Sequence, residues 1–214
     1  MEYFSASFLM NKLAIGCGAL VVLAVIGLML VLAVAGSYNG LVQKSQAVNS
    51  QWAQVQNVYQ RRADLIPNLV STVAGAANFE KTTLTEVVQA RASVGQIKVD
   101  PGNAAQLAQF DKAQGALSSA LSRLLVVSER YPDLKASANF RDLQAQLEGT
   151  ENRITVERGR FNECVQSYNT AIKSFPAVFY SSFFGFAEKP YFTATAGAET
   201  PPKVQFDFNA PAKP

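Results

Sequence analysis

The sequence predicts an all-α protein: an N-terminal single transmembrane helix followed by an antiparallel up-down bundle of four long helices. Two observations carry this prediction. Residues 13–36 contain no charged side chain. Apolar residues then recur every seven positions along residues 38–73 and again along residues 140–175, which places them on one helix face, as in a coiled coil. Short connections between such helices favour antiparallel neighbours.

Residues 13–36 form the expected membrane anchor, after a short N-terminal segment of residues 1–12. At about 1.5 Å per residue the anchor extends roughly 36 Å, enough to cross a hydrocarbon core of about 30 Å. A cleaved signal peptide is the alternative, but its apolar core would be shorter and its start more basic, whereas Glu2 and Lys12 cancel here. Lipid attachment at Cys17 is a weaker alternative, because only a very short apolar run precedes it.

The first bundle helix is expected from about Ser37 to Gly75. Two neighbouring rows of mostly apolar residues lie along it. The rows are Leu41, Val48, Val55, Arg62 and Leu69, and Ser45, Trp52, Tyr59, Ile66 and Val73. Pro67 lies inside this helix, where it has no N–H to donate and crowds the carbonyl of Ala63, so we predict a kink near Asp64.

Cap and stop signals divide the rest of the bundle, which spans residues 37–176, into three more helices. A cap at Asn78 and an Asp100-Pro101 start mark two beginnings, while Pro132 and Pro176 mark two ends. The three helices are expected at about residues 78–96, 102–130 and 133–175. The last one carries the most regular row, namely Phe140, Leu147, Ile154, Phe161, Tyr168 and Phe175.

The unequal helix lengths predict a section with too little cover. The first helix climbs roughly 58 Å from the membrane and the second descends only about 29 Å, while the third and fourth cover about 43 and 64 Å. Only the first and fourth helices would then reach the membrane-proximal section. Two helices do not enclose a core, so we predict that another protomer or a partner packs there. The contact residues would be Val48, Trp52, Phe161 and Tyr168.

Residues 177–192 form an aromatic segment that carries seven aromatic side chains. The topology places this segment near the bilayer, where aromatic side chains suit the interface, although it could instead fold back over open bundle surface. Residues 193–214 are rich in Pro and Ala and are expected to be flexible. Within them, Lys203 to Phe208 alternates in a way that could add a strand to a partner's sheet.

Several charged residues fall inside the predicted helix seams. Arg62 needs a hydrogen-bonded anion there, because an unpaired buried charge costs several kcal/mol. We predict that Arg62 pairs with Glu151, or otherwise with Glu129 or Glu80, and that Arg158 lies on the same inward side as Glu151. Such a charge network would fix helix register. A buried acid/base or ion site is the functional alternative.

Composition excludes several classes of function. The chain has no histidine and only two cysteines, so the familiar nucleophilic triads and a Glu-x-x-His di-metal site cannot be built. Phosphate-binding, dinucleotide-binding and hydrolase motifs are missing from the sequence. The net charge is only +3 and the basic residues do not cluster, so the sequence does not indicate a surface that binds nucleic acid. We therefore expect no enzyme activity, no metal and no cofactor.

The chain resembles the LemA family. The resemblance lies in Tyr38-Asn39, Trp52, RRADLIPNLV at residues 61–70, Phe79-Glu80, Ala90-Arg91-Ala92, ERYPDLKA at residues 129–136, Phe140, Leu143, Leu147, Glu151, Arg158, Phe161-Asn162, Tyr168-Asn169 and Phe175-Pro176. It implies a helical bundle anchored in the bacterial inner membrane by a single pass, with a short external N-terminus and the bundle in the cytoplasm. It also implies an association with envelope stress and membrane proteases.

Three functions are in contention. The first is a non-enzymatic scaffold or adaptor of the bacterial envelope, a homo-oligomer that contacts the lipid bilayer and envelope proteins such as membrane proteases. The second is a membrane stress sensor in which Pro67 is the hinge and the anchor transmits its motion. The third is an enzyme with Glu80, Glu129 or Glu151 as acid/base, which would need a deep pocket around a carboxylate of shifted pKa.

Overall fold

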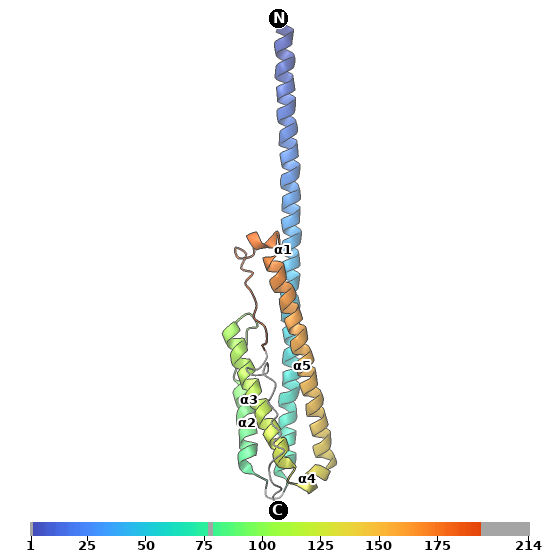
Figure 1. Ribbon diagram of the computed structural model, residues 1–214, viewed down its shortest axis with the longest axis vertical. Coiled ribbons are helices and arrows are strands. Elements are labelled where there is room, and N and C mark those ends of the chain that lie inside the picture. Colours follow the sequence, from blue (N-terminus) through green and yellow to red (C-terminus); the bar gives the residue numbers. More distant parts are fainter. Residues whose placement is uncertain (1, 77–78, 194–214) are drawn as a thin grey trace, which may run out of the picture.

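The computed structural model of the chain describes residues 2–76 and 79–193, and these residues form a helical molecule without a strand (Figure 1). The helices are α1 (Glu2–Ala74), α2 (Lys81–Gly95), α3 (Ala104–Ser128), α4 (Pro132–Ala136) and α5 (Ala138–Lys173), followed by the short 3-10 helix η1 (Ala177–Phe179). The prediction of an all-α protein with one long apolar N-terminal helix is confirmed.

α1 joins the expected anchor and the first bundle helix into one unbroken helix of 73 residues. Its upper half projects alone beyond the other helices (Figure 1), and the large apolar side chains from Leu20 to Leu32 are all more than 45% exposed. By length and composition this part of α1 can cross a membrane, with a mean hydropathy of 2.8. The helix continues through Ser37, so the boundary between anchor and bundle is a change of surroundings and not a break.

The other helices gather around the lower half of α1. α5 lies along α1, and α2 packs on α3 (Figure 1). The seven-residue rows of α1 and α5 face inward as predicted. Of their members only Ser45 and Phe175 are not buried. The core is thus built where the sequence periodicity places it.

The start of α3 differs from the prediction. The cap is Asn103, whose Oδ1 accepts from the backbone N–H groups of Ala105 and Gln106 at 3.0 and 3.1 Å. Asp100 instead accepts from the N–H of Gly102 at 2.8 Å, so the Asp100-Pro101 pair forms a turn before the helix. The predicted cap at Asn78 lies outside the described residues, and α2 begins at Lys81.

The predicted fourth helix, from about residue 133 to 175, is in fact two helices. Ser137 has an extended backbone, with φ −64° and ψ 128°, and separates the short α4 from α5. α5 then ends at Lys173, before the last member of the seven-residue row. Phe175 therefore leaves the helix face and is 80% exposed.

The predicted uncovered surface in the membrane-proximal section is covered in the structure. α2 has 15 residues against 36 in α5, so the expected difference in length is present. Residues 186–193, which we call the C-terminal strap, descend beside α1 and α5 and cover this section (Figure 1). The four predicted contact residues are at most 5% exposed in a single chain, namely Val48, Trp52, Phe161 and Tyr168. They are core residues and are not available to a second protomer.

Candidate functional site

Arg62 is the most deeply buried charged group among the described residues, at 1% exposure. Its Nη1 donates to Glu151 Oε1 at 2.7 Å and to Ser118 Oγ at 2.9 Å, and its Nη2 donates to Gln114 Oε1. α1, α3 and α5 are therefore joined at one guanidinium. Glu151, the first of the three predicted carboxylates, is the partner.

Arg158 joins the same three helices about two turns closer to the membrane along α5 than Glu151. Its Nη1 donates to Asp111 Oδ1 of α3 at 2.6 Å and to Tyr59 Oη of α1 at 3.4 Å. Its guanidinium also lies 4.3 Å from the centre of the Phe192 ring and donates to the carbonyl of Thr193 at 3.4 Å. Arg158 thus ties the C-terminal strap to the helices.

An open cleft of about 930 Å³ runs between the two arginines. Its charged and aromatic lining consists of Tyr59, Arg62, Asp111, Lys112, Glu151 and Arg158. Burial raises the pKa of Tyr59 above its ordinary value, although the nearby Arg158 acts in the opposite direction. Burial acts to lower the pKa of Arg158, but Tyr59 and Asp111 outweigh it and the pKa is raised. The cleft therefore holds a neutral phenol and permanently charged guanidinium groups at neutral pH.

The remaining predicted carboxylates do not belong to this network. Glu80 accepts from Arg130 at 2.9 Å, and Glu129 pairs with Lys135. All four side chains are between 47 and 62% exposed. Neither of these alternative partners contacts Arg62, because Glu80 and Glu129 lie near the lower helix ends, where water can solvate them.

Two asparagines of α5 hold the strap, and the sequence analysis gave them no role. Asn162 donates to the carbonyl of Phe192 and accepts from its N–H, both at 2.9 Å. Asn169 does the same with Lys189, at 2.8 and 2.9 Å. Seven helical residues advance about 10.5 Å and three extended residues about 10 Å, so the two pairs match in length. The signal in the sequence was the seven-residue spacing of the asparagines.

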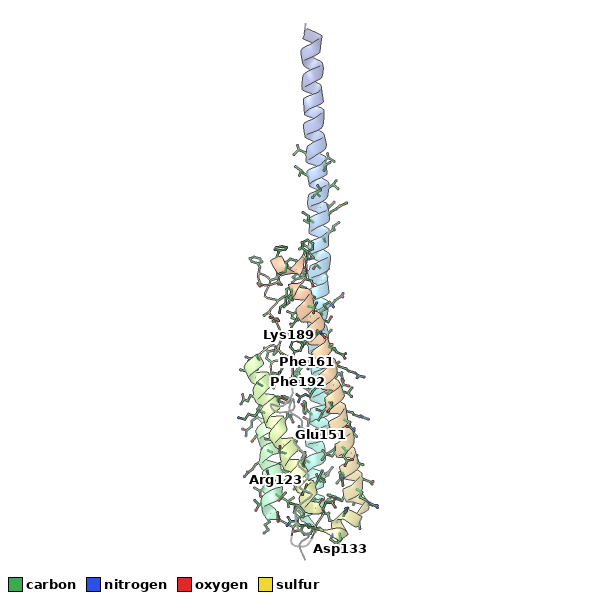
Figure 2. The ribbon with its side chains drawn as sticks, in the orientation of Figure 1. Arg123, Asp133, Glu151, Phe161, Lys189 and Phe192 are labelled. Carbon is green, nitrogen blue, oxygen red and sulfur yellow. The ribbon has the colours of Figure 1, made fainter. Side chains whose placement is uncertain are left out.

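The strap closes the core above the cleft. The ring of Phe192 lies 6.0 Å from Trp52 in a stacked arrangement and 5.4 Å from Phe161, beside which it is drawn in Figure 2. Trp52 also contacts Phe110 of α3, at 5.7 Å. One aromatic residue of the strap therefore supplies the cover that the short α2 cannot give.

Pro67 does not end α1, which continues to Ala74. The carbonyl of Ala63, which would accept from the N–H of residue 67 in a regular helix, accepts from Arg91 Nε of α2 at 2.9 Å. The donor that the proline lacks is thus replaced by a side chain from a neighbouring helix. The sequence indicated the defect but not its partner.

The polar groups of the interior are engaged in contacts between helices. Among the side chains that the structure describes, no group of three metal-ligating residues is found. The two carboxylates of the cleft, Asp111 and Glu151, are each in an ion pair with an arginine. Arg62 and Arg158, with their partners, connect α1, α3, α5 and the strap, each at its own level along the bundle axis.

Fold and site together define a class: a membrane-anchored helical protein whose interior polar groups tie its helices to one another. The sequence model of the LemA family matches residues 51–206. The chain belongs to the LemA family.

Similar proteins agree with this assignment. Protein LemA of Metamycoplasma hominis is 27% identical over 65% of this chain. Magnetosome protein MamQ of Magnetospirillum gryphiswaldense is 24% identical, and Magnetosome protein MamQ 1 of Paramagnetospirillum magneticum 25%, each over 77% of this chain and 67% of the relative. The match spans 61% of the length of the Metamycoplasma protein.

Proposed function

We propose that the protein is a non-enzymatic scaffold or adaptor of the bacterial envelope, held to the membrane by α1. One observation carries this proposal. The two guanidinium groups in the interior each bind carboxylate or amide groups of other helices, Arg62 through Glu151 and Gln114 and Arg158 through Asp111. These bonds use the charges to fix helix positions, which suits a rod that presents a rigid surface.

The cleft supports the non-enzymatic side of the proposal. Its two carboxylates, Glu151 and Asp111, are each in an ion pair with an arginine of another helix, so both have a structural partner. The sequence has no histidine, so the commonest general base is missing from the chain.

The proposal also covers how the helices are arranged and where in the cell the protein lies. α1, α2, α3 and α5 act as one antiparallel four-helix bundle, the anchor lies in the inner membrane, and the bundle lies in the cytoplasm. The chain direction supports the first part, because α1 descends, α2 rises, α3 descends and α5 rises in Figure 1. The resemblance to the LemA family supports the inner membrane as the site of the anchor and the cytoplasm as the site of the bundle.

Self-association and envelope partners, such as membrane proteases, also belong to the proposal. Since Trp52 and Phe161 are buried within one chain, self-association and partner binding need another surface. The best remaining candidate is a groove of about 650 Å³ between α1 and α5, on a different face of α5 from the strap. It is lined mainly by small or polar side chains, among them Ser37, Gly40, Ser167, Thr170 and Ala171, which let a second helix approach closely.

The test is to release the full chain from native membranes with a mild detergent and to measure the mass of the particle and its composition. A scaffold is expected to run as a stoichiometric assembly heavier than one protomer. The control is Arg62→Met/Glu151→Gln, which removes the ion pair of the cleft but leaves the groove between α1 and α5 unchanged, and it should keep the assembly. A particle of monomer mass under all mild conditions contradicts the proposal. A folded control that loses its assembly would show that the cleft itself is a binding site.

The stress sensor is the second candidate, and the contact between Arg91 and the carbonyl of Ala63 favours it. This bond is exposed, so water can replace it when α2 moves. α1 would then bend at Pro67, the one turn that lacks its own helical hydrogen bond. A hinge of this kind lies on the same helix as the anchor, so that bending could be transmitted across the membrane.

A further inference from the structure

Four phenylalanines at the membrane-proximal end of the bundle point into solvent. Phe175, Phe179, Phe183 and Phe184 are 80, 80, 87 and 52% exposed, and Val178 between them is 49% exposed. We call these five residues the aromatic end patch. Every other phenylalanine with a described side chain is buried or half-buried. Such a concentration of exposed apolar rings marks a contact surface.

The patch is built on a hydrogen-bonded turn and not on a loose loop. The N–H of Val178 donates to the carbonyl of Ser174 at 2.9 Å, and that of Ser181 donates to Ala177 at 2.8 Å. Ala177 and Ser181 are buried at 2 and 6% exposure, and they hold the turn against the bundle. Gly185, with φ 78°, then reverses the chain toward the strap. The apolar rings are therefore the outward side of a fixed structure.

The height of the patch along α1 is set by Tyr38. The ring centre of Tyr38 lies 5.4 Å from that of Phe184 and 5.4 Å from that of Phe186. Tyr38 follows the uncharged residues 13–36 by two positions, which is about 3 Å along the helix axis. The interfacial zone on each side of a hydrocarbon core is roughly 5–7 Å thick. η1 accordingly lies beside α1 where α1 leaves the bundle (Figure 1).

The charges near the patch lie on the side away from the anchor. After Lys12 the next charged residue of α1 is Lys44, about 12 Å below Gly36, and it donates to Ser167 of α5. Lys173 pairs with Glu188 at the base of the turn. A layer of rings with charges beneath it matches the change from apolar to polar surroundings across a bilayer interface.

We propose that the aromatic end patch inserts into the interface of the same bilayer that α1 crosses, so that the bundle has two membrane contacts. One helix alone leaves the bundle free to tilt and to rotate about α1, whereas two contacts fix both. The occupant is lipid, because the patch continues the apolar surface of α1 at the height of the interface. The inference rests on the proposed membrane anchorage by α1.

The test uses the full chain in lipid vesicles and tryptophan quenching by brominated lipids. The chain has one tryptophan, Trp52, which is 5% exposed and reports the background. Phe183→Trp is expected to add emission that brominated lipids quench and that is shifted to the blue, while the emission of the unsubstituted protein is unchanged. Phe179→Trp serves as a second probe of the same patch.

The matched control is Val126→Trp on α3, an apolar residue that is 70% exposed at the far end of the bundle. Its added emission should not be quenched. If the protein floats with the vesicles but neither patch probe is quenched, the inference is overturned and the anchorage stands. If the protein does not float with the vesicles, the anchorage itself fails. Patch emission that depends on the protein-to-lipid ratio, without lipid quenching, would assign the patch to a second copy and also overturn the inference.

Discussion

Arg62 occupies a place in the α1 row that an apolar residue would fill in a simple bundle. The cost of burying its guanidinium is offset by bonds to Gln114, Ser118 and Glu151. Glu151 is itself 40% exposed, so the ion pair lies at the edge of the core. Removing the buried Arg62 and removing the half-exposed Glu151 should therefore change the free energy of unfolding by different amounts.

We expect Glu151→Gln to lower the free energy of unfolding by about 1–3 kcal/mol, because the buried guanidinium keeps its neutral partners but loses its counter-charge. Urea unfolding in detergent micelles, followed by Trp52 fluorescence, measures this. Arg62→Met/Glu151→Gln should cost less than the sum of the two single changes, since neither charge is then left alone. Glu148→Gln, on the exposed face of α5, is the control. Additive single changes would contradict the pairing.

Burial of Tyr59 predicts a loss of stability in alkali. Its pKa is raised above the ordinary value by burial, so between about pH 10 and the folded-state pKa only the unfolded chain releases the phenolic proton. The contribution is fully present below about pH 10, and the free energy of unfolding falls as the pH rises above it. Tyr59→Phe should make this decrease shallower, while Tyr168, whose pKa burial also raises, retains part of it. Equal slopes in the two proteins would refute the prediction.

At the scale of elements, the strap is a segment without helical structure that packs along the helices α1 and α5. It is held by side-chain amides that imitate a strand pairing, since Asn162 and Asn169 each donate and accept one backbone hydrogen bond. The ring of Phe192, the residue that Asn162 binds, stacks on the Trp52 indole with 6.0 Å between the ring centres.

We expect Asn162→Ala to release the strap and to cost about 1–3 kcal/mol, because a pair of backbone groups loses its partners. Trp52 emission should shift to the red as Phe192 leaves it, and the N–H groups of residues 189 and 192 should lose protection against hydrogen exchange. Asn152→Ala, on the exposed face of α5, should change neither signal. Unaltered exchange in the Asn162 variant would show that other contacts hold the strap.

The pair formed by Pro67 and Arg91 gives a second prediction at this scale. Pro67→Ala restores the N–H donor to the carbonyl of Ala63 and should stabilise the bundle by up to about 3 kcal/mol. Arg91→Ala should destabilise the native sequence but have little effect in the Pro67→Ala background. Unfolding free energies of the four proteins give the coupling. If the protein is a scaffold, the Pro67→Ala variant should keep its assembly. If it is a stress sensor with a hinge at Pro67, the same variant should lose its response to membrane stress.

At the scale of the whole molecule, the bundle is built around the lower half of one long helix whose upper half is apolar. Since α1 continues from the apolar part into the bundle without a break, the proposed crossing of the membrane by α1 puts the bundle on the opposite side from residues 1–12. For a bundle in the cytoplasm, green fluorescent protein fused to the C-terminus should fluoresce and alkaline phosphatase fused there should be inactive. A chain without residues 1–36 is the control for export that does not depend on α1. Active phosphatase on the full chain would reverse the proposed orientation.

Much of this architecture follows from local patterns. The anchor and the inward rows of α1 and α5 were predictable, because a helix brings residues three, four and seven apart onto one face. The buried Arg62 and its pairing with Glu151 followed from the same rows, since a cation on an inward face needs a carboxylate within reach. The exposed end of that row at Phe175 did not follow, because the end of α5 depends on how the turn at Ala177 packs.

What the sequence alone determined is therefore the all-helical class, the faces that α1 and α5 bury and the long apolar N-terminal helix, all of which depend on neighbours within a few turns. Only the tertiary structure decided what covers Trp52 and Phe161. The cover is Phe192, which Asn162 holds from 30 residues away, and an extended segment of this kind has no helical periodicity to show its partner. Contacts between segments so far apart in the chain are selected by shape and by unsatisfied hydrogen bonds in the folded protein, which is why self-association through Trp52 was a reasonable prediction and was wrong.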